Sequence, residues 1–493
     1  MTKTSLTKRV FEGMRWNAVS MTLTHSSGLV RSIILARLLS PDDYGLFALA
    51  ATVMSALSAL TDLRLDGSVI ANKFEDDKEL HDYLNTIWTV GIVRRFCLSA
   101  LVFIFAYPAA RFYGDDRLYL ILLSICLTPF IQSFHNIGLV LLRKKVNFKR
   151  VVYFEQTTNF VSLAVVILLG WLTRNVWALV LGQLAGTLLS VLLSYVFHPF
   201  RPRPAFKREA FNRSLSFGKH MFVISLMTYV VTTVDNIVVG KLLGASVLGA
   251  YVIAYSLARL PVLILNGVIS NVTFPAYAEL ASGNSQRLEN AFAKVFTLST
   301  TLLTLVTVPI MLLAEDVTAI LYGSKWKAAA PLLPIMALIG IFRGMANLIS
   351  PLAMGLNRPG NDAKAKVIEG VLFLSLIYPL TARYGTIGAA WAGVIVYFIT
   401  FLIRFEFARR ILPNVSRRLQ WVLVNALVAA AMGGLAGMLL ISFIETGWVR
   451  LLAGGGISIC VTGLSMLMMR SDLRQAVSNA SNILRSKETP SEI

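Results

Sequence analysis

Long apolar stretches recur from one end of the chain to the other, separated by short polar breaks. About 20 helical residues cross a bilayer core of about 30 Å, so each stretch can form a membrane-spanning helix. About fourteen such spans are predicted. Their approximate limits are 16–38, 44–62, 85–108, 118–142, 154–172, 176–197, 215–240, 246–273, 291–313, 331–355, 365–382, 386–408, 420–443 and 447–468. The pattern therefore predicts an all-α polytopic membrane protein.

The composition excludes several classes of soluble protein. Of 493 residues, 56% are hydrophobic and 15% are charged, which is too few charges to cover a water-facing surface of this size. A soluble enzyme, a nucleic-acid binder and a secreted disulfide scaffold are therefore excluded. The three cysteines are far apart within apolar stretches, so we interpret them as reduced, small hydrophobic residues. The polar, basic N-terminus lacks the apolar core of a signal peptide, so we expect the first helix to remain in the mature protein.

The net charge of +20 is explained by membrane topology. If the N-terminus is cytoplasmic and the loops alternate, 32 Lys and Arg residues fall inside, 9 fall outside, and 5 lie in or at the edges of spans. Cytoplasmic loops collect Lys and Arg. Both termini are therefore expected in the cytoplasm, and most of the excess charge acts as an insertion signal.

The two halves of the chain resemble each other. Residues 31–50 align without gaps on residues 235–254, an offset of 204. The identical pairs are Ile33 and Ile237, Leu38 and Leu242, Leu39 and Leu243, Gly45 and Gly249, and Ala50 and Ala254. Each repeat holds six spans, an even number, so both copies run the same way through the membrane. A substrate site is then expected between the two lobes, near mid-membrane.

The repeat predicts the domain organisation. The parts are an N-terminal lobe at 1–198, a cytoplasmic linker at 199–219, a C-terminal lobe at 220–410, an additional helix pair at 411–470 and a cytoplasmic tail at 471–493. No predicted outer loop exceeds about twenty residues, which leaves no room for an extracellular catalytic domain. The motifs GxxxxGK[ST], HExxH and GxSxG are absent from the sequence. We therefore expect a protein that is not an enzyme, with no cofactor and no metal.

The arrangement resembles the polysaccharide transporter branch of the MOP flippase superfamily, which includes Wzx-type flippases and exporters of colanic acid and succinoglycan type. The resemblance covers about residues 8–470, and its most specific parts are 33–50 and the segment DNIVVGKLLG at 235–244. It implies alternating-access translocation of undecaprenyl-pyrophosphate-linked oligosaccharide units across a bacterial inner membrane, for exopolysaccharide or lipopolysaccharide synthesis. It also implies a V-shaped fold with a hydrated cavity. The expected partners are this substrate, membrane lipids, a polysaccharide polymerase and a chain-length regulator, without nucleic acid.

Arg31 and Asp235 are charged residues within predicted spans, where charge is costly and usually functional. Thr24, Ser27 and Arg31 share one face of the first span, and Asp235 is the repeat counterpart of Arg31. Two interpretations stay open: the two residues form an ion pair bridging the lobes, or they bind cargo in the cavity. Both can hold in different conformations.

Arg259 and Arg343 lie midway along the eighth and tenth spans without a charged partner at helical spacing. A pyrophosphate suits the planar guanidinium fork. The resemblance implies that cavity arginines hold the phosphates, and this role is assigned to Arg31 and Arg259 by helix position, and to Arg343 by depth. The alternative is a structural arginine that caps carbonyls or pairs with Asp62 or Asp235.

Other polar residues have weaker assignments. Asp62 ends a stripe on the second span and is a counter-ion, a proton or sodium coupling site, or an interfacial residue, with the last favoured. His25 and His135 lie within spans and could relay protons, although a satisfied buried histidine is the commoner case. Glu155 and Glu369 recur in both halves beside Arg150 and Lys364, as structural ion pairs. The basic loops 143–150 and 198–219 could also hold anionic lipid headgroups.

Two alternative functions remain open. One is a cation-coupled multidrug antiporter of the same superfamily, which is disfavoured because the charge within the spans is mostly positive. The other is a membrane glycan polymerase or ligase, which is disfavoured by the short outer loops.

Overall fold

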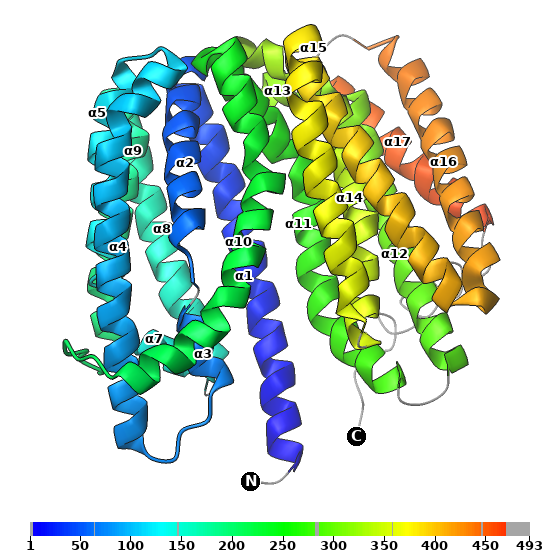
Figure 1. The fold of residues 1–493 in the computed structure, drawn as a ribbon. Helices are drawn as coiled ribbons and strands as arrows, with labels where there is room; N and C mark the ends of the chain where they lie inside the picture. Colours follow the sequence, from blue (N-terminus) through cyan, green and yellow to red (C-terminus); the bar gives the residue numbers. More distant parts are fainter. Residues whose placement is uncertain are drawn as a thin grey trace, which may run out of the picture. The chain divides into compact units, whose positions relative to one another are not determined.

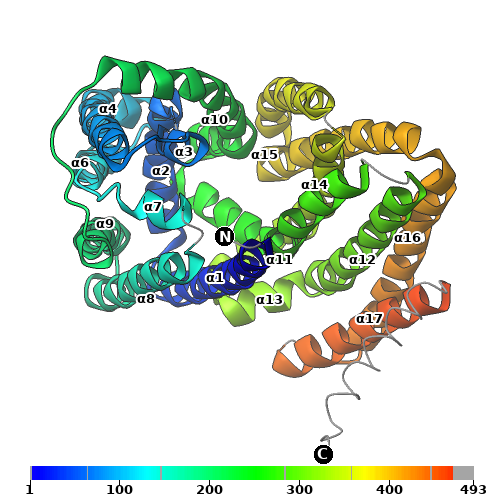
Figure 2. The ribbon, with the colours of Figure 1, turned by 90° about the horizontal axis from the view of Figure 1, so that it is seen from below.

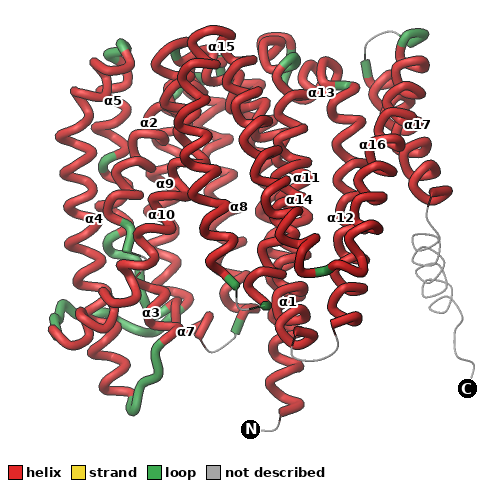
Figure 3. Tube along the Cα trace, turned by 45° about the vertical axis from the view of Figure 1, so that its right-hand side comes forward, coloured by secondary structure: helices red, strands yellow, loops and turns green. Residues whose placement is uncertain are grey.

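A computed structural model describes residues 3–63, 65–144, 147–281, 285–356, 358–444 and 447–469. Within these ranges, the regular structure is helical throughout, and Figure 3 shows only helices joined by loops. Ten of the described helices are long and apolar enough to cross a membrane. The all-α polytopic fold is therefore confirmed, whereas the number of about fourteen spans stays a prediction.

The first half of the chain forms helices α1 to α9. Their bounds are α1 Lys3–Leu38, α2 Pro41–Thr61, α3 Leu65–Ala71, α4 Asp77–Tyr113, α5 Arg117–Ile125, α6 Leu127–Gln132, α7 Leu139–Lys144, α8 Phe148–Thr173 and α9 Trp177–Phe197. Several ends follow local capping rules. Ser40 begins α2 with a capping box, accepting a hydrogen bond from the backbone N–H of Asp43, and Pro41 occupies the first turn, where its missing N–H is not needed.

The second half forms helices α10 to α17. Their bounds are α10 Arg208–Leu243, α11 Ala245–Ala281, α12 Ser285–Leu312, α13 Ala314–Leu321, the 3-10 helix η1 Ser324–Ala329, α14 Leu332–Gly355, α15 Pro359–Ile411, α16 Pro413–Ile441 and α17 Trp448–Met469. Helix α15 contains two predicted spans, 365–382 and 386–408. Gly385 lies between them with φ of 61°, a left-handed conformation that favours glycine.

The predicted span 118–142 is wrong as a continuous helix, because the chain breaks there into α5, α6 and α7. Asn136 lies in the last break. Its side-chain amide donates to the carbonyl oxygens of His198 and Phe200, at 3.2 and 2.8 Å, and its side-chain oxygen accepts from Gly138 N. Non-helical backbone is tolerated at membrane depth only where polar partners satisfy it. The Asn136 side chain satisfies Gly138 N within the break and ties the break to the segment that follows α9.

The chain divides into two compact units. Unit 1 contains residues 1–253 and 370–389, and unit 2 contains residues 254–369 and 390–493. The chain therefore passes from one unit to the other within α11 and twice within α15, rather than in loops. The lobes 1–198 and 220–410 that the repeat predicts stay a prediction.

Unit 1 contains a polar seam between α1 and α8, which lie side by side. Gln156 of α8 donates to the side chains of Ser20 and Thr24, both at 3.0 Å, and Asn159 donates to Ser27 at 2.6 Å. Small polar residues that hydrogen-bond across helices are typical of packing within membranes. Much of the polar stripe predicted on the first span therefore serves helix packing.

Unit 1 also holds a close approach between the start of α2 and the start of α11. A Cβ atom added at Gly45 would lie 2.9 Å from Ala245 Cα and closer still to its carbonyl oxygen. A Cβ added at Gly249 would lie 2.9 Å from the carbonyl carbon of Pro41 and closer still to its oxygen. Gly45 and Gly249 are repeat equivalents at an offset of 204, and so are Pro41 and Ala245. The contact is therefore reciprocal: the glycine of each helix meets the first residue of the other helix.

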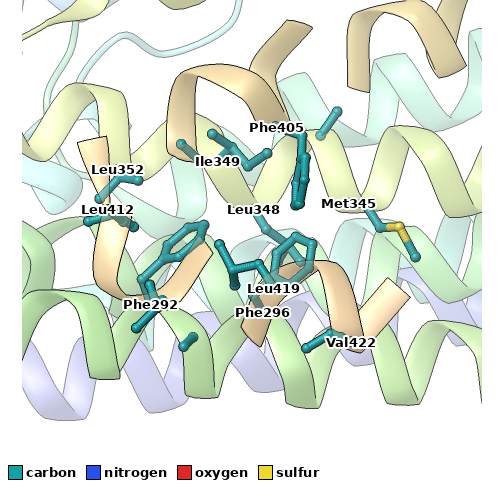
Figure 4. Close-up of a cluster of buried hydrophobic side chains, with 14 of the residues drawn as sticks. Phe292, Phe296, Met345, Leu348, Ile349, Leu352, Phe405, Leu412, Leu419 and Val422 are labelled. Atoms are coloured by element: carbon teal, nitrogen blue, oxygen red, sulfur yellow. The ribbon is translucent and has the colours of Figure 1, made fainter. Parts of the chain in front are cut away.

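The core of unit 2 lies where α12, α14, α15 and α16 meet. Figure 4 shows its aromatic centre, in which Phe292 and Phe296 of α12 face Phe405 of α15 and Leu419 of α16. The rings of Phe296 and Phe405 have centroids 6.1 Å apart. This packing joins α12, α14, α15 and α16 of unit 2.

The helix pair α16 and α17 packs through small residues, and Figures 1 and 2 both show the two helices side by side. Gly433 of α16 faces Thr462 and the Ser458 carbonyl of α17, and Gly437 faces Ser458 as well. Large apolar side chains of the pair are exposed, including Leu427 and Leu439. Small residues inside and large apolar residues outside are the pattern of a helix pair that faces lipid.

Candidate functional site

Two arginines of unit 2 converge on one tyrosine. Tyr255 and Arg259 lie one turn apart on α11, and the Arg259 guanidinium is 5.6 Å from the centre of the Tyr255 ring. From α14, Arg343 Nη1 donates a hydrogen bond to Tyr255 Oη at 2.9 Å. Arg343 also lies over the ring of Tyr397 of α15, at 5.4 Å. The structure thus brings together two of the three arginines that the sequence singled out.

The close approach of α14 to α11 positions this cluster. A Cβ atom at Gly340 would lie 3.0 Å from the Ala258 carbonyl oxygen, so a larger residue would push the helices apart. A small cavity of about 40 Å³ lies between the helices and is lined by Tyr255, Arg259 and Arg343. The arginines and the tyrosine therefore face a shared space.

The cluster is electropositive. Among the described residues, neither Arg259 nor Arg343 is in ion-pair contact with a carboxylate. The carboxylate that acts electrostatically on Arg343 is that of the fully buried Glu369, and its direct ion-pair partner is Lys366, at 3.2 Å. Tyrosine rings and hydroxyls stabilise a cation without neutralising it. Two guanidinium groups within predicted spans, neither in direct contact with a described carboxylate, form an anion-binding arrangement.

Arg31 lies in unit 1, where it lines a cavity of about 550 Å³. Arg95, Asp66 and His135 line the same cavity. Its other polar lining residues are Gln132, Ser162, Gln183, Thr187 and Ser190. The sequence places Arg95 within the span 85–108, but nothing in the helical spacing pairs it with Arg31 or His135. Only the tertiary fold brings these groups to one cavity.

Asp235 and Asp62 are both engaged within unit 1. Asp235 has an exposed fraction of 6%, and its carboxylate accepts a hydrogen bond from Tyr251 Oη at 3.0 Å. Asp62 ends α2 and pairs with Arg94 Nη1 of α4 at 3.2 Å. The structure therefore gives these two acids partners other than the three predicted arginines, and their role in coupling stays a prediction.

The remaining polar residues have structural contacts. The His135 backbone carbonyl accepts from Trp88 Nε1 at 3.2 Å, and its ring packs edge-on against Phe154. Glu155 pairs with Arg143 at 2.8 Å. Glu155 and Glu369 therefore form ion pairs as expected, but with Arg143 and Lys366 in place of the predicted Arg150 and Lys364. Within the described ranges, no group of three or more His, Cys, Asp or Glu side chains is placed to hold a metal ion.

Comparison with protein families gives one match that covers more than half of the chain. A family model described as "Polysaccharide biosynthesis protein" matches residues 34–331. Similar curated proteins include the lipopolysaccharide biosynthesis protein WzxC of Escherichia coli, 24% identical over 407 residues that cover 81% of each chain. The succinoglycan biosynthesis transport protein ExoT of Rhizobium meliloti is 25% identical over 343 residues, covering 69% of this chain and 67% of ExoT. The teichuronic acid biosynthesis protein TuaB of Bacillus subtilis is 24% identical over 441 residues, covering 88% and 89%.

Comparison with solved structures gives the fold. The lipid II flippase MurJ in an inward closed conformation superimposes with a TM-score of 0.73 at 16% identity, covering 93% of this chain and 99% of MurJ. An inward-facing multidrug resistance transporter of the MATE family superimposes with a TM-score of 0.61 at 17% identity, covering 80% and 96%. At these identities the likeness concerns the arrangement of helices alone.

Proposed function

The chain belongs to the polysaccharide biosynthesis protein family, and from this premise we propose that it is a flippase for lipid-linked oligosaccharides. The substrate is an undecaprenyl-pyrophosphate-linked repeat unit, moved from the inner to the outer leaflet of a bacterial inner membrane for exopolysaccharide or lipopolysaccharide synthesis. Both termini lie in the cytoplasm. The similar proteins WzxC, ExoT and TuaB serve lipopolysaccharide biosynthesis, succinoglycan transport and teichuronic acid biosynthesis by their names, which supports this assignment.

The observation that carries the proposal is the convergence of Arg259 and Arg343 on Tyr255. A diphosphate has several acceptor oxygens and about two negative charges, and guanidinium groups bind it through paired N–H donors. Tyr255 holds both cations in place through its ring and its hydroxyl. The pair therefore supplies the counter-charge that a phosphate-bearing headgroup needs in an apolar environment.

Arg31, which lies in unit 1, is also proposed to bind diphosphate. The cavity that it lines carries amide and hydroxyl side chains, including Gln132, Gln183 and Ser190, which hydrogen-bond readily to sugar hydroxyls. An arginine among such groups suits a headgroup that carries phosphate and sugar on neighbouring atoms.

The proposed mechanism is alternating access. The cavity between Arg259 and Arg343 has about 40 Å³ and can hold only a few water molecules. A diphosphate therefore binds in a conformation in which α11 and α14 are further apart. After the diphosphate is released, the two helices come together again around the arginine cluster. Asp235, buried beside Tyr251, is the candidate coupling residue, while Asp62 beside Arg94 is an interfacial pair.

The test replaces the arginines one at a time in the full-length chain. Arg259→Ala and Arg343→Ala should abolish export of the polysaccharide while the protein stays in the membrane at normal abundance. Arg287→Ala is the matched control, because Arg287 is an exposed arginine of unit 2 outside the cluster, and it should export normally. Normal export by Arg259→Ala at normal abundance would refute the site.

Two other functions are distinguished by the phenotypes that they predict. A cation-coupled drug antiporter needs carboxylates that attract cationic drugs, whereas the described cluster is cationic; drug resistance conferred on an expressing strain would favour it. A polymerase or ligase would leave translocated but unpolymerised units in a deletion strain. A flippase mutant instead accumulates units in the inner leaflet.

A further inference from the structure

A second groove of unit 2, separate from the Arg259–Tyr255–Arg343 cluster, has a volume of about 710 Å³. It is formed by the last turns of α14 and by the beginning and end of α15, which both belong to unit 2. Its charged lining residues are Arg358, Asp362, Lys364, Arg404, Glu406 and Arg410. Nothing in the proposed transport cycle uses them.

The groove lies near the two ends of α15, where the predicted spans 365–382 and 386–408 begin and end. Lys364 is five residues from the beginning of α15 at Pro359, and Arg404 is seven residues from its end at Ile411. At 1.5 Å per residue, both side chains begin within about 10 Å of a helix end. The headgroup layers of a bilayer lie just outside its hydrocarbon core, at the ends of spanning helices. The charge pattern predicts that this end is cytoplasmic, the leaflet face that attracts juxtamembrane cations.

Arg404 is a buried cation with unused donors. Its exposed fraction is 4%, and its Nη2 atom lies 2.9 Å from Asp362 Oδ1. That same carboxylate oxygen also accepts a hydrogen bond from Ser350 Oγ at 2.6 Å. Among the described residues, neither Nε nor Nη2 of Arg404 has a hydrogen-bond acceptor in suitable geometry. Buried donors without acceptors are costly, and an additional oxygen acceptor in the groove would lower that cost.

The groove carries more positive than negative charge. Its four cations face two acids, and the acids are already paired: Asp362 with Arg404 at 2.9 Å and Glu406 with Arg410 at 2.8 Å. Arg358 and Lys364 are exposed, and neither is in ion-pair contact with a described carboxylate. The groove therefore carries a net charge of about +2. These charges lie beside the buried Arg404 guanidinium, some of whose N–H donors have no acceptor among the described residues.

An apolar wall completes the groove. Ile368 is 39% exposed and Leu402 is 46% exposed, and both line the same space as the cations. A free inorganic anion has no apolar part that could contact this wall, whereas a phospholipid carries acyl chains close to its phosphate. Cations and apolar side chains at headgroup depth together match the two ends of one lipid molecule.

We propose that this groove binds an anionic phospholipid, with the phosphate against Arg358, Lys364 and Arg404 and an acyl chain against Ile368 and Leu402. The bound lipid anchors the junction of α14 and α15. The recognised chemistry is a phosphate ester, and the apolar wall selects the lipid form over free phosphate.

The first experiment measures lipid binding to the purified full-length chain in detergent. Phosphatidylglycerol is titrated, and the bound lipid is counted by native mass spectrometry, with phosphatidylcholine as the zwitterionic comparison. The double variant Arg358→Ala/Lys364→Ala should bind phosphatidylglycerol about 25-fold more weakly, since each cation near the surface contributes about fivefold. The control Arg287→Ala/Lys294→Ala removes two exposed cations of unit 2 outside the groove and should bind normally. Equal binding by the two variants overturns the proposal.

The second experiment separates a lipid from free phosphate. Leu402→Gln keeps the charge of the groove but makes its apolar wall polar, and it should weaken phosphatidylglycerol binding several-fold. Inorganic phosphate at millimolar concentration should not displace the lipid from the unmodified chain. Displacement by phosphate, together with unchanged binding by Leu402→Gln, shows a simple anion site and overturns the assignment to a lipid.

Discussion

The reciprocal contact between the starts of α2 and α11 predicts a strong, position-specific response to a single methyl group. In Gly45→Ala, the new Cβ would lie 2.9 Å from Ala245 Cα and closer to the neighbouring carbonyl oxygen. Carbon atoms in contact prefer about 3.5–4.0 Å. Because the opposing atoms are backbone atoms, no side-chain rotation relieves the clash, and the two helix starts must separate.

The magnitude follows from two opposing effects. Overpacking a tight contact costs about 1–3 kcal/mol, and a clash with backbone belongs at the upper end of that range. Alanine recovers up to about 1 kcal/mol of helix propensity relative to glycine. The net expectation for Gly45→Ala is a loss of about 2 kcal/mol. Gly28→Ala is the matched control, because a Cβ at Gly28 meets nothing within 4 Å, and it should be neutral or slightly stabilising.

The assay is thermal unfolding of the full-length chain in detergent, followed by tryptophan fluorescence. Gly45→Ala should melt several degrees below the unmodified chain, and Gly28→Ala should not. Gly249→Ala should behave like Gly45→Ala, and the double variant should lose less than the sum of the two, because the first substitution already separates the helix starts. Equal melting temperatures for Gly45→Ala and Gly28→Ala would refute the reasoning, as would full additivity in the double variant.

Two further predictions concern Tyr255 and the loop after α4. Tyr255→Phe keeps the ring beneath Arg259 but removes the hydroxyl that accepts a hydrogen bond from Arg343. Transport in reconstituted vesicles should therefore fall about five- to tenfold, and it should fall further in Tyr255→Leu. An equal loss in both variants would contradict a separate role for the hydroxyl. Arg117 bonds to Asp42 and to Asp115 and so lowers the pKa of the Asp115 carboxyl. Because the pKa of Asp115 is lowered, its interaction with Arg117 stabilises the fold above about pH 4, and this stabilisation is lost as the pH falls further. The difference in melting temperature between the unmodified chain and Arg117→Gln should therefore narrow below about pH 4. A difference that widens there would contradict this assignment.

The helices were predictable from the sequence where one local property decides them. Apolar length located α8, α9 and α12 closely, because the bilayer imposes a fixed length on any span. The break between α6 and α7 was not predictable in this way. It depends on Asn136, whose partners His198 and Phe200 are about 60 residues away and whose isolated amide is compatible with a helix.

The candidate site was predictable only in part. Charge within an apolar stretch singled out Arg259 and Arg343, because an unpaired cation there is costly whatever the fold. Their shared partner was not predictable, since Tyr255 meets Arg343 only through the packing of α14 on α11. Arg95 was missed as a companion of Arg31 for the same reason: helical spacing says nothing about which helices enclose a cavity.

The reciprocal glycine contact also has an evolutionary consequence. Here the glycine of the first repeat meets the helix start of the second repeat, and the glycine of the second meets the helix start of the first. Identical subunits related by a twofold axis make contacts of this form. In a homodimer of a shorter ancestral chain, that glycine would occur once in each subunit and twice in each dimer, so every mutation of it would change both sides of the interface at once. Gene duplication and fusion end that constraint. Afterwards either glycine can drift alone, and one half of the molecule is free to specialise while the other keeps the original fit.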